Sequence, residues 1–525
     1  MTGEKQKTMV KIFIDERKLE VEEGMTVLEA AERFGIRIPH LCYHKAFIPE
    51  GSCRMCLVEI EGLPKLELAC STRVREGMKV LTRNDRVIEA RKGVLECLLA
   101  EHPIDCPICD KAGECKLQDY YEEHGLFDSE FKEYKERGQK KVDLGKNLLH
   151  DQERCILCTR CVRFLREVTK TEELGVFQRG VHSEINIYNG VPVNNNYSGS
   201  LAEICPVGAI TDKDFRFKTR TWFLKSEASI CPLCSRGCNI FVESPQGFSR
   251  FSLPKRVYRI RSRENNNVNG FWICDLGRYG YSYLDKDRIR EIHVYDSQKT
   301  YTWPGLTSFL AEKIKRMYHR RMSSHIGLIL NSWLSNEELF LIDRLFRKDL
   351  GVEKIGFLDP PQGETDGFLL TAERTPNRRG AQEIGFNLQP SNWEVFFEKL
   401  ELLLVFSSPL LDQSDVVPLQ AALSEKKMKI LFASNEHEIQ CQFDVVLPLS
   451  LITEKGGSLT NVDGLVQTFS PALESPGICQ PEWKVLVDLA KELKINYNFY
   501  SQFSSPEVIR EEMKKGISFF GKNSE

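Results

Sequence analysis

The twelve residues ERCILCTRCVRF, numbers 153–164, place three cysteines within a single short turn. Cys155, Cys158 and Cys161 follow the spacing C-x2-C-x2-C, and a distant fourth cysteine, Cys205, stands directly before a proline. Three ligands in a tight turn with a remote fourth before proline is the pattern of a [4Fe–4S] site. In proteins with two such clusters the remote cysteine serves the other cluster, but this segment has one compact triad. We therefore expect Cys205 to complete a [4Fe–4S] site with the triad.

Three further groups of donors extend this pattern along the first half of the chain. Eighteen cysteines are present in 525 residues, and fifteen of them, with one histidine, fall into four groups before residue 275. Each group supplies the four donors that an iron–sulfur cluster needs. A chain with several clusters in series is most simply a conductor of electrons. The other three groups are Cys42, Cys53, Cys56 and Cys70; His102, Cys106, Cys109 and Cys115; and Cys231, Cys234, Cys238 and Cys274.

The first group, with spacing C-x10-C-x2-C-x13-C, predicts a [2Fe–2S] cluster. Upstream of it, alternation over 9–14 and a second apolar stretch after a polar turn predict a hairpin. Thr26 and Glu29 have the capping-box spacing of a short helix, which Gly35 ends. Hairpin, helix and cysteine-bearing loop resemble the β-grasp fold of plant-type [2Fe–2S] ferredoxins. A zinc site would favour two C-x2-C pairs, and this group has one.

The second group, H-x3-C-x2-C-x5-C, begins with a histidine that follows an amphipathic helix predicted over 84–101. Only three cysteines lie within reach, so we expect His102 to be the fourth ligand of a [4Fe–4S] cluster. A neutral imidazole in place of a thiolate makes the cluster less negative and raises its reduction potential. The alternative is a three-cysteine site completed by water or another ligand.

The fourth group, C-x2-C-x3-C-x35-C, has a remote last ligand and is the weakest of the four signals. It resembles the iron–sulfur segment at the start of molybdopterin oxidoreductases, which predicts a third [4Fe–4S] cluster. Zinc is the alternative occupant. The remaining cysteines, Cys97, Cys441 and Cys479, have no partners nearby in the sequence, and we expect them to be buried small apolar side chains.

Composition excludes several classes of function. A formal net charge of -3 and a pI near 6.4 give no basic excess for binding nucleic acid. No secretory signal is visible, and no apolar run approaches the ~20 residues of a membrane-spanning helix. We expect a soluble or peripheral protein in a reducing compartment, where clustered thiols bind metal rather than form disulfides.

The rest of the chain changes its pattern twice. The charged and aromatic stretch 118–143 reads as a helical connector. Beyond Trp303, helical segments alternate with apolar runs at 326–330, 402–406, 430–433 and 445–449. This alternation predicts a Rossmann-like parallel sheet.

The order and spacing of the four groups resemble the large iron–sulfur subunit of respiratory complex I, a family that includes the G subunit of bacterial NADH:quinone oxidoreductase and the mitochondrial 75 kDa subunit. The phrases that carry the resemblance are GSCRMCLVEIEG (51–62), HPIDCPICDKAGEC (102–115), ERCILCTRCVRF (153–164) and CPVGAIT (205–211). The match is close over 9–290 and looser beyond, where TEKGGSLTNVDGLVQ (453–467) is similar to a molybdopterin-domain loop. The fourth group is similar to that of bacterial members, which implies a bacterial origin.

The resemblance implies an α+β and α/β multidomain chain. Molybdopterin enzymes usually have lysine and arginine where this chain has Leu276 and Leu465, and about 250 residues follow Cys274. We therefore expect a truncated, degenerate molybdopterin-oxidoreductase-like Rossmann-type domain without a pterin. The expected domains are a β-grasp [2Fe–2S] ferredoxin domain (1–83), a [4Fe–4S] domain with one histidine and three cysteine ligands (84–123), a ferredoxin-like [4Fe–4S] domain (124–220), a molybdopterin-oxidoreductase-type [4Fe–4S] domain (221–300) and the degenerate domain (301–525).

By the same resemblance, the chain is an electron-transfer subunit of NADH:quinone oxidoreductase, a translocase, and has no catalytic residue of its own. Electrons would enter from the flavin subunit at the first group, pass the third and second groups, and leave toward quinone; the fourth group lies off this line. The implied partners are the flavin/NADH-binding subunit, the small [2Fe–2S] subunit and the quinone-side iron–sulfur subunits, on the cytoplasmic side of the bacterial inner membrane. The rivals are an electron-transfer subunit of an NAD-linked hydrogenase or formate dehydrogenase, a catalytic molybdoenzyme, and an architectural zinc protein.

Overall fold

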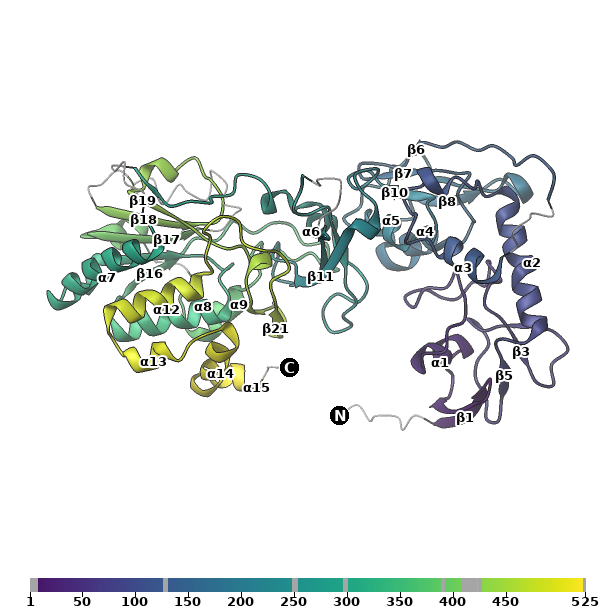
Figure 1. Ribbon diagram of the computed structural model, residues 1–525, viewed down its shortest axis with the longest axis horizontal. Helices are drawn as coiled ribbons and strands as arrows, with labels where there is room; N and C mark the ends of the chain where they lie inside the picture. The colour runs from purple at the N-terminus through teal and green to yellow at the C-terminus, as the bar shows by residue number, and fades with distance from the viewer. Residues whose placement is uncertain are drawn as a thin grey trace. The chain divides into compact units, whose positions relative to one another are not determined.

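The computed structural model describes residues 8–125, 131–247, 254–295, 301–388, 392–407, 423 and 427–522. The chain divides into two compact units, residues 1–223 and residues 224–525, whose helices and strands are labelled in Figure 1. Over the described ranges, no helix combines the length and apolar character that crossing a bilayer requires.

The first unit begins with a five-stranded mixed sheet of order β2-β1-β5-β3-β4, in which β1 runs antiparallel to β2 and parallel to β5. The predicted hairpin and capping box are both confirmed, since Thr26 Oγ1 accepts from the Glu29 amide and the Glu29 carboxylate accepts from the Thr26 amide. Buried residues of the helix α1 and of the strands share one core. The elements are β1 (Met9–Ile14), β2 (Arg17–Glu22), α1 (Val27–Arg33), β3 (Leu57–Ile60), β4 (Glu67–Leu68) and β5 (Lys79–Leu81).

Short helices and strands make up the rest of the first unit and carry the second and third groups. A three-stranded antiparallel sheet of order β10-β7-β6 sets Ile210 opposite His150, so the segment after Cys205 lies beside the segment before Cys155. The elements are α2 (Asp85–Glu101), η1 (Cys106–Ile108), α3 (Lys116–His124), β6 (Val142–Asp143), β7 (Leu148–His150), α4 (Arg160–Arg163), the π-helical η2 (Phe164–Thr169), β8 (Leu174–Phe177), η3 (Gly180–His182), β9 (Glu184–Ile187), α5 (Ser200–Ile204), β10 (Ile210–Asp212) and η4 (Thr221–Phe223).

The second unit opens with a three-stranded antiparallel sheet, β11-β12-β13, that adjoins the fourth group. Its main sheet has the order β14-β19-β18-β17-β15-β16, parallel except for the edge strand β14, which confirms the predicted α/β sheet. Alternate residues of β17 enter two different cores, Leu402 and Leu404 with the helices α7, α8 and α12, and Leu403 and Val405 with the opposite core. Both faces of the sheet are therefore buried, which is why its strands are continuous apolar runs.

The bounds of the second unit's elements are β11 (Leu224–Ile230), β12 (Asn239–Pro245), β13 (Arg259–Ser262), α6 (Asp275–Tyr279), η5 (Ser282–Leu284), β14 (His293–Val294), α7 (Trp303–His319), η6 (Ser323–His325), β15 (Ile326–Leu330), α8 (Asn336–Ile342), the π-helical η7 (Asp343–Asp349), β16 (Lys354–Phe357), α9 (Arg378–Ile384), α10 (Trp393–Phe397), β17 (Leu402–Ser407), β18 (Met428–Ala433), η9 (Gln440–Gln442), β19 (Val445–Pro448), η10 (Ile452–Glu454), β20 (Gly457–Thr460), β21 (Val466–Phe469), α12 (Glu482–Leu493), α13 (Tyr497–Ser501), α14 (Pro506–Gly516) and α15 (Ser518–Lys522).

Two expectations are wrong. The helical connector stops at His124, because residues 131–141 are non-helical and almost wholly exposed; 126–130 lie outside the described residues. That stretch has charge without an apolar stripe, so it has no face to bury. Cys97 and Cys441 are exposed, and of the three residual cysteines only Cys479 is buried as expected.

Candidate metal centres

The first group lies in the loop between α1 and β3 and in the turn after β4. Its four cysteines are at most 5% exposed. The backbone amides of Leu41 and Cys42 both donate to the Cys53 sulfur at 3.4 Å, and positive φ angles at Gly51 and Arg54 turn the loop tightly. Because backbone amides face this sulfur, the loop suits an anionic sulfur centre.

The thiols of the first group form two interacting pairs. A hydrogen bond from Cys53 lowers the pKa of Cys42 to about 5, and a hydrogen bond from Cys56 lowers the pKa of Cys70. The same bonds, with burial, raise the pKa of Cys53 and of Cys56. These hydrogen bonds favour the thiolate form, which binds metal, at Cys42 and Cys70.

The second group lies between the end of α2 and the start of α3. His102 is the C-cap of α2 and Cys115 the N-cap of α3, and both line one cavity together with Cys106. Burial lowers the pKa of His102 to about 4, which keeps the imidazole neutral at pH 7. The ring bonds to the backbone of Arg154 while its Nδ1 is buried without a hydrogen-bond partner among the described residues. A metal-bound histidine commonly uses its second nitrogen in this way.

The third group lines a cavity in the first unit. All four cysteines, Cys155, Cys158, Cys161 and Cys205, line it, as does His150. Positive φ at Leu157 and Thr159 closes the turn that carries the triad. Burial raises the pKa of Cys155, Cys158 and Cys161, so without metal these thiols would stay protonated. Four soft donors around one cavity, three of them buried and Cys155 partly buried, fit a [4Fe–4S] cluster.

Two buried arginines of α4 tie the third group to the first. Arg163 Nη2 donates to the carbonyl oxygens of both Cys42 and Cys158, and its Nη1 donates to Ile48 O at 3.0 Å. Arg160 donates to Tyr43 O and, at 3.1 Å, to Ile204 O beside Cys205. Burial lowers the pKa of Arg160, and the nearby cysteine sulfurs of both groups oppose this shift. Two buried cations between two groups of sulfur donors suit anionic clusters on both sides.

The third group also contacts the second. A Cβ placed on Gly208, three residues after Cys205, would lie 2.3 Å from the Cys109 sulfur, so only glycine allows this approach. Lys111 Nζ donates to Ala202 O at 3.2 Å. The third group therefore adjoins both the first and the second.

The fourth group lies in the second unit, between β11, β12 and the first turn of α6. Its four cysteines are each 5% exposed. Gly277 is close to two of the sulfurs, since an added Cβ would lie 3.1 Å from that of Cys231 and 3.8 Å from that of Cys274. Burial raises the pKa of Cys231 and Cys238, and that of Cys274 to about 11.

In the described part of the chain, no three His, Cys, Asp or Glu side chains are arranged to hold a metal ion. The ligands of an iron–sulfur cluster bind different irons around a core several ångströms wide, so they need not converge on one point.

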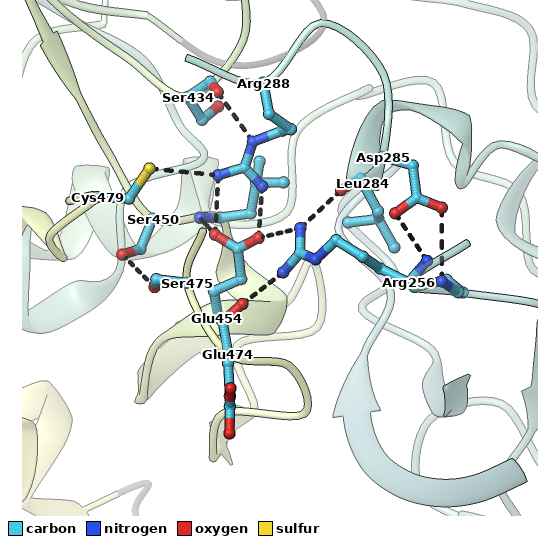
Figure 2. A network of polar contacts seen from close by, with 12 residues as sticks. Arg256, Leu284, Asp285, Arg288, Ser434, Ser450, Glu454, Glu474, Ser475 and Cys479 are labelled. Carbon is cyan, nitrogen blue, oxygen red and sulfur yellow. Dashed lines mark hydrogen bonds and ion pairs between the residues drawn. The ribbon is translucent and has the colours of Figure 1, made fainter. Parts of the chain in front are cut away.

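The carboxyl edge of the main sheet is filled by ion pairs. Lys455 donates to Glu338 and to Glu482. Arg288 pairs with Glu454, to which Arg256 also bonds (Figure 2). The cavity left at this edge, next to Asn331, is about 30 Å³, enough for roughly two waters. Leu276 is 41% exposed rather than bridging the fourth group to this edge.

The sequence patterns do not single out Arg160, Arg163, His150 or Gly208 as parts of these sites. Both arginines stand within the quoted motif, but a motif does not reveal that their partners lie more than a hundred residues away. A histidine and a glycine close to cysteines in sequence are too common to single out.

Models of known families match the chain in five segments. They are described as a 2Fe-2S iron-sulfur cluster binding domain (7–85), an NADH-ubiquinone oxidoreductase-G iron-sulfur binding region (91–130), an NADH-quinone oxidoreductase subunit 3 ferredoxin-like domain (145–211), a molybdopterin oxidoreductase Fe4S4 domain (224–286) and a molybdopterin oxidoreductase (377–492). The predicted multidomain architecture is thereby confirmed.

Individual proteins match about two-thirds of the chain. The chain is 38% identical over 349 residues to an NADH-ubiquinone oxidoreductase 75 kDa subunit of Reclinomonas americana, covering 66% of this chain and 49% of that protein. It is 37% identical over 351 residues to a G-type subunit of the NADH-quinone oxidoreductase of Rhizobium meliloti, covering 66% of this chain and 40% of that protein. The chain thus spans half or less of the length of these relatives. A solved NAD+-reducing [NiFe]-hydrogenase chain is 33% identical, with a TM-score of 0.37, and covers 40% of this chain and 91% of its own.

Proposed function

Since this chain belongs to the family of the NADH-quinone oxidoreductase G subunit and the 75 kDa subunit over the two-thirds that these relatives match, we propose that it is the electron-transfer subunit of an NADH:quinone oxidoreductase. It takes electrons from the flavin subunit and passes them toward quinone. It contributes to the oxidoreductase and translocase activity without a catalytic site of its own.

The proposed cofactors are one [2Fe–2S] cluster on Cys42, Cys53, Cys56 and Cys70 and three [4Fe–4S] clusters on the other three groups. When bound, such clusters accept and release single electrons. The chain's own residues exclude water by burying the thiols, turn amides toward the sulfurs, and hold the groups at fixed separations. We also propose that the second unit binds no pterin and serves as a structural support, a role that the small cavity at the carboxyl edge of its main sheet supports.

The observation that best supports a series of sites is the Arg163 guanidinium, which bonds the carbonyl of a first-group ligand and that of a third-group ligand. This bond keeps the two groups adjacent, and the glycine at 208 keeps the third adjacent to the second. Electrons can therefore pass from the first group to the third and then to the second without crossing a gap filled by solvent. We propose the flavin subunit, the small [2Fe–2S] subunit and the quinone-side iron–sulfur subunits as partners, at the cytoplasmic face of a bacterial inner membrane.

Rapid-freeze electron paramagnetic resonance of the assembled complex after mixing with NADH tests this proposal. In a Cys158→Ala variant that lacks the third cluster, the first cluster is expected to be reduced at the native rate and the His102 cluster to stay oxidised on that timescale. A His102 cluster reduced as fast as in the native complex contradicts the series. Cys97→Ala, an exposed cysteine outside the groups, is the matched control.

A further inference from the structure

One histidine of the third group's cavity has no partner for either ring nitrogen. His150, the last residue of β7, is 0% exposed, and neither Nδ1 nor Nε2 has a hydrogen-bond partner among the described residues. The ring lines the same cavity as the four cysteines. Buried polar groups are rarely left unpaired, so this side chain calls for an explanation.

The surroundings leave few acceptors for this ring. Its backbone belongs to the β10-β7-β6 sheet, whose amides and carbonyls pair with one another. The other wall of the cavity is apolar, formed by Ile156, Ile185, Val207, Ala209 and Ile210. Arg160 and Thr159 also line it. The Arg160 side chain has no acceptor atom, and the Thr159 hydroxyl already bonds the Glu50 carboxylate, Cys158 O and Arg163 Nε. The sulfurs of the third site are the acceptors that remain among the side chains of this lining.

The His150 ring has an N–H to donate whether it is neutral or charged. A neutral imidazole has one N–H donor and one acceptor nitrogen, and the ring that carries this unpaired donor borders a cavity lined by the cluster ligands.

We propose that His150 donates a ring N–H hydrogen bond to a sulfur of the [4Fe–4S] cluster held by Cys155, Cys158, Cys161 and Cys205, and so raises the reduction potential of that cluster. The inference rests on the proposed function, because it requires the cluster to be present. A hydrogen bond to sulfur stabilises the more negative, reduced state more than the oxidised state. The third site adjoins both neighbouring groups, so its potential affects transfer in either direction.

Redox titration of the full cluster-loaded chain, followed by electron paramagnetic resonance, tests the proposal. The third cluster's signal is identified by its loss in Cys161→Ala. In His150→Phe, which keeps the ring's bulk without a donor, the ratio of reduced to oxidised third cluster at fixed ambient potential is expected to fall about tenfold, or ~59 mV for a one-electron couple. The first and His102 clusters, titrated in the same sample, should not move. His124→Phe, a change of a histidine on α3 that lines neither cavity, should leave all signals unchanged.

Conservative variants separate hydrogen bonding from packing. The amide of Asn occupies the position of Nδ1 and that of Gln the position of Nε2, so one of His150→Asn and His150→Gln should restore the native potential and identify the donor. If His150→Phe fails to hold the cluster, a second measurement decides: in the native chain labelled with ¹⁵N-histidine, the reduced third cluster should show weak coupling to one histidine nitrogen.

An unshifted potential in His150→Phe, or no histidine coupling in the native chain, overturns the assignment of His150 and leaves the proposed function intact. A native chain without any third-cluster signal overturns the proposed function itself. The two failures are therefore distinguishable.

Discussion

Replacing Arg163 with methionine should loosen the junction between the first and third groups. The Arg163 side chain is 2% exposed and bonds three carbonyl oxygens, those of Cys42, Ile48 and Cys158. Methionine fills similar space but donates nothing. The carbonyls of Cys42 and Cys158 are buried, and each costs about 1 to 2 kcal/mol when left unpaired, so the local loss is roughly 2 to 4 kcal/mol. Since about 1.4 kcal/mol is a factor of ten, opening of this junction should become ~30- to 700-fold more frequent.

Hydrogen exchange measured by mass spectrometry on the cluster-loaded full chain gives the change in opening frequency directly. The amides of Phe47 and Ile48, bonded to His44 O and to the Glu167 carboxylate, lie at the junction and should lose protection by the same factor. The matched control is Arg33→Met, at the end of α1 with a 51% exposed side chain that pairs with Glu22, which should change protection by less than about 0.5 kcal/mol. If Arg163→Met exchanges at these amides within threefold of the native chain, the junction does not depend on this guanidinium.

Gly208→Ala puts a Cβ 2.3 Å from the Cys109 sulfur, so it should abolish the His102 cluster and remove about four irons per chain. Gly93→Ala, with open space around it, should leave the iron content unchanged, and a full iron content in Gly208→Ala would count against the contact. His102→Cys should keep a [4Fe–4S] cluster of lower potential, because a thiolate adds negative charge, and an unchanged potential and spectrum would show that His102 is not a ligand. Burial raises the pKa of Glu482 to about 8, above its value in the unfolded chain. The unfolded state therefore releases this proton first, and the calorimetric stability of the second unit should fall as the pH rises from about 4.5 to 8. Glu482→Gln should flatten this slope, and an equally steep slope in the variant would be the contrary result.

Local patterns in the sequence were sufficient for much of the fold. The alternation over 9–14 predicted β1, and Thr26 with Glu29 predicted the start of α1, because both depend on neighbours within a few residues. The apolar runs at 326–330 and 402–406 became adjacent parallel strands, as runs buried on both faces usually do. Donor spacing defined four groups, and the structure brings all four cysteines of the third group to one cavity.

What the sequence could not predict depends on packing between distant segments. The bond from Arg163 to Cys42 O spans 121 residues, and nothing near either residue signals the other. The exposure of Cys97 was missed because the face of α2 that contains it is not covered, whereas Val87 and Leu95 on the same helix are buried. Likewise, the charged stretch after α3 has helix-forming residues but no apolar face to pack, and packing supplies most helical stability.

The central claim is that four groups of donors hold one [2Fe–2S] and three [4Fe–4S] clusters. Metal and sulfide analysis of the anaerobically purified full chain tests it most directly. About fourteen irons with as many acid-labile sulfides, and neither zinc nor molybdenum in stoichiometric amount, is the predicted result. Stoichiometric zinc with about ten irons or fewer, or one molybdenum or tungsten per chain, would contradict the account.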